Sequence, residues 1–546
     1  MKGEKLMASA KDDLRFLELK DTISQLNITI SSQNELIKSL NTTIAGLNEQ
    51  IDYLKKKLYG SSSEKRDKDF NYQGQLSLFD DVEVPVEEIE PEFIEVKYKR
   101  ERKPKPTLED QFEKLPVREV IVDTLSDEDK ICTECGTQMV PIGKEVIRTE
   151  IEFVRPKMER VIYYATTYEC PKCKDTEEPQ FIKDNGKSAL IAGSYISESL
   201  AAYIIYQKYV QSVPLYRLEQ DFKQYEALIT RATMARNVIA ISSEYFKPMF
   251  DYFHRKLLER YFIMMDESPL QVLKEPDRRP QSKSYFWITR TGEDGLPPIV
   301  LYRYTETRAG ENAKDFLDGI NPGFYLMADG FGGYNKLKNA KRCCCYAHIR
   351  RYFTEAIPKG HEKDFTHPAV QGVLYCNKLF EYERIYKEKC LSYTQRYKRR
   401  LKDEKPVVEA FLAWAEAQAL KPSPSASLTK ALNYVLNRKQ FLFTYLEDGR
   451  CSLSNNNSEN SVRPVTVGRK NWLFSDSQDG AEASMLCYTI IEMAKTYNLK
   501  IYDYILFLLS ERPSKDMTDE ELDKLSPWSD GIGERIDEFI KSRESR

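Results

Sequence analysis

The chain has 546 residues, which is too long for one hydrophobic core, so we expect three or more domains. Hydrophobic residues make up 41% and charged residues 31% of the chain, and no apolar run reaches the roughly 18 residues of a membrane span, so no membrane-spanning segment is expected. The formal net charge of −3 does not by itself indicate a nucleic-acid partner, and any basic surface must be local.

The N-terminal residues and the cysteine pattern indicate the cellular compartment in which the protein is expected. Residues 1–11 lack the apolar core of a signal peptide, so a cytoplasmic, nucleoid-associated location is expected. Four of the 11 cysteines form two Cys-x-x-Cys pairs, and three more are consecutive at 343–345. Without an export signal, metal binding or buried thiols are favoured over disulfides.

Residues 12–59 are predicted to form a coiled coil. Isoleucine recurs every seven residues at the a positions, and leucine occupies nearly every d position: Ile23, Ile30, Ile37, Ile44 and Ile51, then Leu19, Leu26, Leu40, Leu47 and Leu54. This combination favours a parallel two-stranded coiled coil, and hence a homodimer. The alternative is a long amphipathic helix packed on its own chain.

A linker is predicted at 60–115, where an acidic block at 80–95 precedes a basic block at 97–105, and this segregation of charge favours disorder. The next segment, 116–186, is predicted to be a zinc-binding module. Its expected ligands flank a β-hairpin predicted from the segments 146–154 and 160–168: Cys132, Cys135, Cys170 and Cys173. Two such pairs supply the four thiolates of a closed, structural zinc site.

Residues 187–258 are predicted to be helical, with helices at 194–210, 214–225 and 231–242. Thr230 is the expected N-cap of the third helix. The short turn between the second and third helices resembles a helix-turn-helix, which would place three side chains of the third helix on DNA: Arg231, Thr233 and Arg236. The alternative is an ordinary helical connector.

An α/β catalytic domain is predicted at 259–350 and 451–480. The pattern predicts strands, one helix and a final strand-helix unit in this order: strands at 261–265, 284–289 and 298–304, a helix at 311–317, strands at 324–328 and 342–346, and a helix from 347. This order fits a ribonuclease-H-like arrangement, in which sites collect at strand ends.

A helical insertion is predicted at 351–450, with a basic cluster at 396–400 and a break at 421–425. Two closing helices are expected at 481–512, and the tail at 513–546 is expected to be loosely ordered. The fold class is therefore multidomain α+β.

Three acids are candidates for a catalytic metal site. Asp266 and Asp329 each follow an apolar run, and Glu459 opens a helical segment. Carboxylates at adjacent strand ends, joined by one on a helix, can hold two magnesium or manganese ions for phosphoryl transfer. Each acid also has a structural alternative: a turn at Asp266, a turn dipeptide at Asp329-Gly330, and a capping box at Asn456-x-x-Glu459.

The acid motifs resemble those of insertion-sequence transposases of the IS66 type. The matching stretches are Asp266-Glu267-Ser268-Pro269-Leu270, Asp329-Gly330-Phe331-Gly332-Gly333-Tyr334 and Ser454-Asn455-Asn456-Asn457-Ser458-Glu459-Asn460-Ser461-Val462-Arg463-Pro464. The third motif is long and specific, and the likeness extends over nearly the whole chain.

This resemblance implies a DDE transposase in which Asp266, Asp329 and Glu459 hold the catalytic metals. Three basic residues after the third acid would hold phosphates or orient that acid: Arg463, Arg469 and Lys470. The implied partners are the DNA of the element ends and of the target, together with accessory proteins of the same element.

Cys345-Tyr346-Ala347-His348 matches a Cys-x2-His element of the same family. It leaves open a second zinc whose other two ligands are not evident, against a buried strand thiol beside a helix-start histidine. For the whole chain, the alternatives to a transposase are a non-catalytic dimeric zinc-containing DNA-binding protein, an inactive transposase relative, and a nuclease without strand transfer.

Overall fold

The computed structural model describes residues 126, 130–132, 134, 135, 137–139, 157–170, 181–184, 186–421 and 425–544. The predicted coiled coil at 12–59 and the predicted linker at 60–115 lie outside the described residues, as does Cys173. Among the described helices, none combines the length and apolarity that crossing a membrane would require.

In the predicted zinc module, the described residues form two short antiparallel pairings. Ile131 and Gln138 form a bridge on either side of Cys132 and Cys135, and β1 (Thr167–Glu169), which directly precedes Cys170, pairs with β2 (Phe181–Lys183). The hairpin prediction was partly wrong, because 160–166 is not a strand and β1 pairs with a later segment instead. The other predicted hairpin segment, 146–154, lies outside the described residues.

The three helices predicted within 187–258 are present, and a fourth helix that was not predicted follows them. They are α3 (Glu198–Tyr209), α4 (Leu215–Lys223), α5 (Arg231–Ile241), a π-helical turn η1 (Ser242–Phe246) and α6 (Lys247–Leu258). The Thr230 side chain accepts a hydrogen bond from the backbone N–H of Thr233, which confirms the predicted cap of α5. No break follows α5, since η1 joins it directly to α6.

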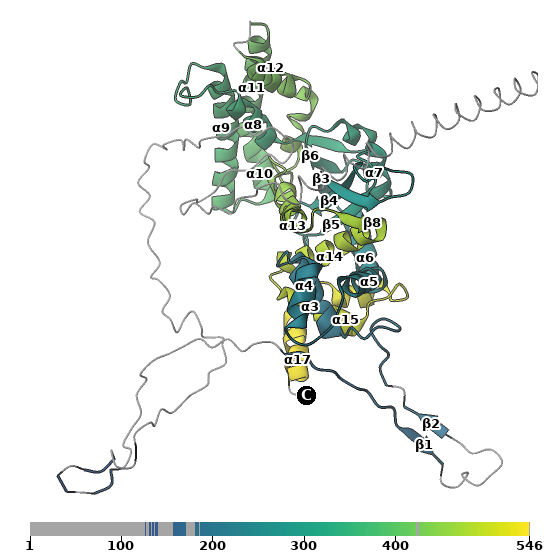
Figure 1. The fold of residues 1–546 in the computed structure, drawn as a ribbon. Helices are drawn as coiled ribbons and strands as arrows, with labels where there is room; N and C mark the ends of the chain where they lie inside the picture. The colour runs from purple at the N-terminus through teal and green to yellow at the C-terminus, as the bar shows by residue number, and fades with distance from the viewer. Residues whose placement is uncertain are drawn as a thin grey trace, which may run out of the picture. The chain divides into compact units, whose positions relative to one another are not determined.

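A mixed six-stranded sheet forms the centre of the region predicted to be catalytic (Figure 1). Its strands are β3 (Phe262–Lys274), β4 (Lys283–Thr291), β5 (Val300–Thr305), β6 (Tyr325–Ala328), β7 (Lys341–Cys344) and β8 (Ser475–Ser477). The spatial order is β5-β4-β3-β6-β7, with β8 paired to β3. Contacts among β3, β4 and β5 are antiparallel, whereas β3, β6 and β7 run parallel.

Each predicted element of this domain is present, but β3 is longer than expected. The strand continues eight residues past Asp266 and stays paired with β4, so neither a strand end nor a turn lies at this acid. The helix between β5 and β6 is α7 (Gly310–Phe316), a 3₁₀ turn η2 (Gly332–Lys336) follows β6, and α8 (Tyr346–Glu355) follows β7.

Two hydrophobic cores cover the two faces of the sheet. Alternate residues of β3 belong to different cores, with Ile263 and Met265 in one and Phe262 and Met264 in the other, as the two-residue repeat of a strand requires. The first core includes α3–α6 and the two predicted closing helices, α14 (Gln478–Thr496) and α15 (Ile501–Glu511). The second core includes the helical insertion (Figure 1).

The insertion between β7 and the third motif contains no strand among its described residues. It consists of α9 (Pro368–Glu388), α10 (Tyr393–Arg399), a π-helical turn η3 (Arg400–Glu404), α11 (Lys405–Ala419), α12 (Ala426–Leu436) and two 3₁₀ turns, η4 (Lys439–Phe441) and η5 (Thr444–Glu447). The third motif then begins α13 (Asn456–Trp472). Arg400 does not belong to an exposed basic cluster, because its side chain is fully buried.

Arg400 lies in a buried polar network that includes Glu404. Burial, and after it the charge of Glu383, raises the pKa of Glu404 to about 9. One carboxyl oxygen of Glu404 accepts a hydrogen bond from the hydroxyl of Tyr445 at 2.7 Å, while the other is buried without a hydrogen-bond partner. Burial beside Glu383 therefore favours the protonated form of the Glu404 carboxyl in the folded chain.

Glu404→Gln is expected to flatten the dependence of stability on pH. An unfolded glutamate ionises near pH 4.3, so between about pH 4.3 and 9 the folded chain binds more protons than the unfolded chain, and stability falls as pH rises. Glutamine is neutral in both states and removes this slope. Chemical unfolding of both chains at pH 5.5 and at pH 8.5 measures the effect, on the order of a few kcal/mol. Glu409→Gln, at an exposed site of α11, is the control and should retain the wild-type slope.

The predicted loosely ordered tail is a folded part of the first core. It forms α16 (Asp519–Leu525) and α17 (Ile532–Glu544), whose inward side chains are buried: Leu522, Leu525, Ile532 and Ile536. The hydroxyl of Tyr252 on α6 also donates a hydrogen bond to Asp523 at 2.6 Å. The polar composition concealed an apolar stripe with helical spacing.

Candidate functional site

The pairing of three parallel strands brings Asp266, Asp329 and Cys345 into one row. Met264 of β3 pairs with Met327 of β6, which in turn pairs with Cys343 of β7. All three of these residues face the second core. Two residues further along each strand, the same register places Asp266 level with Asp329, and Asp329 level with Cys345. Because side chains alternate along a strand, this row faces the same way as the row before it.

The two aspartates lie just beyond the last residue pair through which β3 and β6 run parallel, although β3 itself continues. Asp266 is 8% exposed, and its Oδ1 accepts the backbone N–H of Glu267 at 2.9 Å. Asp329 Oδ1 accepts the backbone N–H of Phe331 at 2.9 Å. Burial, followed by the charges of Glu267, Asp329 and Glu459, raises the pKa of Asp266 well above its usual range. The metal-free site is therefore crowded with carboxylates that oppose one another's ionisation.

The start of α13 is fixed to β3 and to the end of β7. The Asn455 side chain donates a hydrogen bond to the carbonyl of Met265 at 3.0 Å, and its backbone N–H lies 3.2 Å from Cys345 Sγ. Asn455 therefore positions the helix through the sheet and makes no side-chain cap. Glu459 lies in the first turn of this helix, and its backbone N–H donates to the carbonyl of Asn455 at 3.0 Å.

The other two antiparallel strands also hold this first turn. Arg290 of β4 donates to the carbonyl of Asn457 at 2.9 Å and to the hydroxyl of Ser461 at 3.0 Å. Tyr302 of β5 donates to the carbonyl of Ser461 at 2.6 Å. Residues 159 to 171 positions apart in the sequence are thereby held together, and Glu459 is brought to the edge that carries the aspartates.

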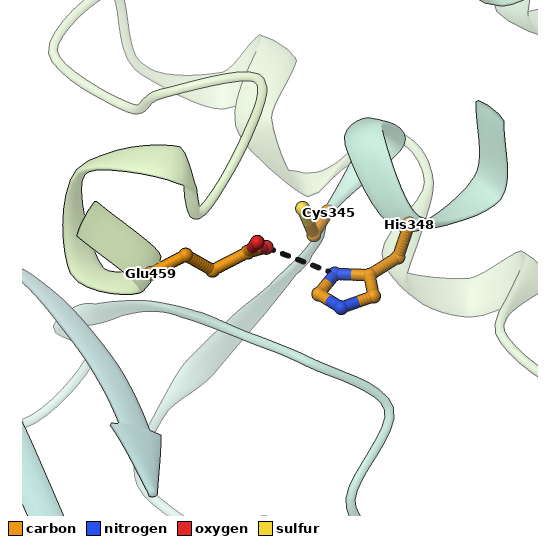
Figure 2. Close-up of side chains that lie close together, drawn as sticks. All are labelled: Cys345, His348 and Glu459. Atoms are coloured by element: carbon orange, nitrogen blue, oxygen red, sulfur yellow. Dashed lines mark ion pairs between the residues drawn. The ribbon is translucent and has the colours of Figure 1, made fainter. Parts of the chain in front are cut away.

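The carboxylate of Glu459 contacts two side chains of α8. Oε2 accepts from Arg351 at 3.1 Å, and Oε1 lies 3.6 Å from His348 Nδ1 (Figure 2). Although burial opposes it, the adjacent Cys345 and Glu459 raise the pKa of His348 to about 9. The Glu459 side chain thus points to α8 and the end of β7. The N-cap of α13 is Asn455, not the Asn456 of the capping-box alternative, and its side chain makes no cap hydrogen bond.

A further acid of the site, Glu267, and the arginine that contacts it, Arg308, were missed at the sequence level. Glu267 is buried, and burial followed by the charge of Asp329 raises its pKa to about 7. Its carboxylate accepts from Tyr334 and from Arg308 at 2.6 Å, and the same guanidinium lies 3.8 Å from Asp329. Glu267 directly follows the first acid, which was a signal, whereas nothing in the sequence around Arg308 indicated its role.

The donor set at this edge fits a hard divalent cation. Asp266, Asp329 and Glu459 offer only oxygen ligands, which magnesium and manganese prefer. Burial is the largest cause of the raised pKa of Asp266, and the negative charges of Glu267, Asp329 and Glu459 add to it. A divalent ion would relieve this repulsion, and Asp266 would lose its proton to bind it.

The predicted DNA-contacting residues of α5 lie at the surface. Arg231 and Arg236 are exposed and Thr233 is half-buried. The Thr233 hydroxyl lies 3.1 Å from the Thr230 hydroxyl and accepts a 3.4 Å hydrogen bond from Arg236, so it braces the start of the helix. The two guanidinium groups remain accessible to a phosphate backbone.

The three basic residues of α13 lie in different environments. Arg463 and Lys470 are exposed. Arg469 is half-buried, and its guanidinium donates to the backbone carbonyl of Pro269 in β3. Burial lowers the pKa of Arg469. This arginine therefore ties the third motif to the strand of the first motif.

The comparison of the chain with known families identifies its family. Residues 193–483, more than half of the chain, match the family model described as Transposase IS66 family. The chain belongs to the IS66 transposase family. The matched segment contains all three candidate acids together with α3–α6 and the helical insertion, so the resemblance found in the motifs is confirmed.

Two further family models match the N-terminal part of this IS66 transposase. The zinc-finger binding domain of transposase IS66 matches residues 129–174, which include all four predicted cysteine ligands, and this match supports zinc as their metal. A model described as Transposase C of IS166 homeodomain matches residues 46–120.

Relatives of this IS66 transposase occur in Sinorhizobium fredii (strain NBRC 101917 / NGR234). Uncharacterized protein y4qI is 26% identical over 501 residues, covering 88% of each chain. Uncharacterized protein y4jD is 24% identical over 495 residues, covering 88% of this chain and 93% of that protein. Uncharacterized protein y4hP is 25% identical over 441 residues, covering 76% of this chain and 77% of that protein.

Proposed function

We propose that this IS66 transposase is a DDE enzyme that cleaves DNA at the ends of its insertion sequence and joins those ends to target DNA. Asp266, Asp329 and Glu459 are its catalytic acids. One observation carries the proposal: two level aspartates on adjacent parallel strands meet a glutamate whose charge contributes to the raised pKa of Asp266. No covalent bond between protein and DNA is required.

The sheet topology supports a ribonuclease-H-like frame for this chemistry. Three antiparallel strands precede a helix, and two further strands then run parallel to the first of them. The insertion enters after α8 and leaves just before the third motif, so the catalytic domain is split in sequence. Such a frame places acids on rigid strands, where their separation is fixed before substrate arrives.

The residues around the acids have distinct proposed roles. Magnesium or manganese bound by the three acids would activate the attacking hydroxyl and stabilise the leaving 3′ oxygen. Arg351 orients the Glu459 carboxylate, and Arg308 does the same for Glu267 beside Asp329. Arg463 and Lys470 are exposed on the helix that carries Glu459 and are proposed to hold phosphates of the bound strand.

The remaining partners belong to the same proposal. A cysteine quartet with structural zinc would stabilise the module at 116–186, and the heptad at 12–59 would join two chains into a dimer. Accessory proteins of the same element are expected from the family resemblance alone.

The proposal is tested with the purified full chain and linear DNA that carries the element's ends. We expect nicked or cut ends and joined products with magnesium, and none with a chelator. Cut ends without joined products indicate a nuclease. End-specific binding without any cleavage indicates the alternative function, a dimeric zinc-containing DNA-binding protein, and either result contradicts the transposase assignment.

Removing both exposed arginines of α5, Arg231→Ala with Arg236→Ala, is expected to weaken binding to DNA. Each lost phosphate contact lowers the slope of log affinity against log salt concentration by about 0.9, so the double variant should lose nearly two units. Fluorescence anisotropy with end DNA at several salt concentrations measures this slope. A matched pair on the insertion, Arg384→Ala with Arg399→Ala, should retain the wild-type slope. Equal slopes in all three chains would remove α5 from the interface.

A further inference from the structure

Three potential metal ligands from separate elements meet beside the proposed catalytic acids. They are Cys345 after β7, His348 in the first turn of α8 and Glu459 in the first turn of α13 (Figure 2). Their ligand atoms all lie within 4.8 Å of one another. Among the described residues, they form the one group of three His, Cys, Asp or Glu side chains with such spacing.

The distances suit a single ion. With zinc bonds of about 2.0 Å to nitrogen or oxygen and about 2.3 Å to sulfur, tetrahedral geometry separates ligand atoms by roughly 3.3–3.6 Å. His348 Nδ1 and Glu459 Oε1 are already 3.6 Å apart. Small side-chain rotations would bring the remaining pairs, which lie within 4.8 Å, to the same separation.

Two features indicate that the cluster is a built site. Cys345 is 1% exposed and its sulfur lies 3.2 Å from the backbone N–H of Asn455, which ties the first ligand to the helix that carries the third. His348 Nδ1 is buried and has no hydrogen-bond partner among the described residues. A buried polar atom without a partner costs free energy, and a bound ion at this position would satisfy it.

The chemistry of the donors selects the class of metal. Cys345 and His348 supply a soft sulfur and a borderline nitrogen, which favour zinc and disfavour magnesium. One thiolate and one carboxylate balance the charge of a divalent ion. Because the pKa of His348 is raised to about 9, two protons pass to solvent on binding, one from the Cys345 thiol and one from the His348 imidazole. Three protein ligands leave a fourth position open, unlike the closed four-cysteine site expected in the zinc module.

We propose that Cys345, His348 and Glu459 bind a zinc-class divalent ion at a second site, one that shares Glu459 with the catalytic magnesium site. An ion bound to Oε1 would occupy the second oxygen of the Glu459 carboxylate, because Arg351 already donates to Oε2. The shared glutamate couples zinc occupancy to catalysis, and this consequence alone rests on the proposed function.

Metal content measures the site without any reaction on DNA. The purified full chain is equilibrated with zinc, freed of unbound ion by dialysis without chelator, and assayed for zinc per chain. We expect two zinc ions in the wild type, and one in Cys345→Ser and in His348→Ala. Cys344→Ser is the matched control, because Cys344 is also buried beside the cluster without being one of its ligands, and it should retain two.

Cobalt substitution reports the ligands directly. Cobalt added to the chain whose cysteine module is already filled with zinc should give a thiolate-to-cobalt absorption band that Cys345→Ser lacks and Cys344→Ser keeps. Glu459→Gln should weaken cobalt binding by at least about tenfold, since even groups that only orient a ligand contribute that much. Circular dichroism of each variant identifies any that fail to fold.

One zinc per chain in the wild type, or a cobalt band that survives Cys345→Ser in a folded variant, overturns the proposal. Both readouts are independent of strand cleavage, so an inactive chain that still binds two zinc ions contradicts the transposase function and leaves this site supported. A fully active chain with one zinc contradicts only the site.

Discussion

Asp266→Asn is expected to reduce strand cleavage and joining by at least about 10³-fold, because metal-assisted stabilisation contributes several kcal/mol and each 1.36 kcal/mol is a factor of ten in rate. Asparagine keeps the shape of the side chain and its hydrogen bond from Glu267, but it removes the negative charge. Products on end-containing DNA, with magnesium and with manganese, measure the loss.

Two further measurements separate this effect from misfolding. Binding to end DNA in the absence of divalent metal should be unchanged. The metal-free variant should also unfold at an equal or higher denaturant concentration than the wild type, because a buried carboxyl with a raised pKa is removed from beside Glu267 and Asp329. Asp318→Asn, at an exposed position before β6, is the control and should retain full activity. Joining that persists in Asp266→Asn would exclude this residue as a catalytic acid.

The order of elements in the sheet was predictable because each strand carries its own apolar pattern. The apolar runs that end at Asp266 and Asp329 predicted β3 and β6, and their parallel pairing then makes the two acids level. The end of β3 was not predictable. Pro269 suggested a turn, but it lies within β3, opposite Tyr285 of β4. Pairing with β4 keeps the chain extended well past Asp266.

Contacts between distant segments were beyond the sequence. Glu459 was recognised from its motif, yet its contacts with Arg351 and His348 depend on how α8 follows β7. Arg308 is one charged residue among many until the fold places it beside Glu267 and Asp329. For the same reason, the alternative of a second zinc at Cys345 and His348, left open at the sequence level, had no third ligand until the structure placed Glu459 beside them.

Arg400 illustrates the same difficulty with a larger energetic consequence. In sequence it belongs to a basic run, and in the structure it is 0% exposed at the junction between the insertion and the third motif. Its guanidinium donates to Glu383 at 2.6 Å and to the carbonyls of Tyr445, Asp448 and Cys451 at 2.8–3.1 Å. One side chain therefore holds the segment that leads from the insertion back to α13.

Arg400→Met is expected to destabilise the insertion by about 3–5 kcal/mol, the usual cost of removing one partner of a buried ion pair. Methionine fills much of the volume, but it leaves the Glu383 carboxylate and three backbone carbonyls without their donor. Arg400→Lys should fall between the wild type and Arg400→Met, because an ammonium retains the charge but cannot reach all four acceptors in the planar geometry of a guanidinium. Chemical unfolding and limited proteolysis of the full chain compare the three proteins.

The neighbouring Arg399 provides the control for this prediction. Its side chain is about half exposed and pairs with Asp403 at 3.1 Å, so Arg399→Met should cost at most about 1 kcal/mol. Because the segment that Arg400 holds continues into the helix of Glu459, Arg400→Met should also lower strand joining, although Arg400 makes none of the contacts around the three acids. Equal stability of the two methionine variants would show that the buried network does not hold this junction, and the position of Glu459 would then depend on other contacts, such as those of Asn455, Arg290 and Tyr302.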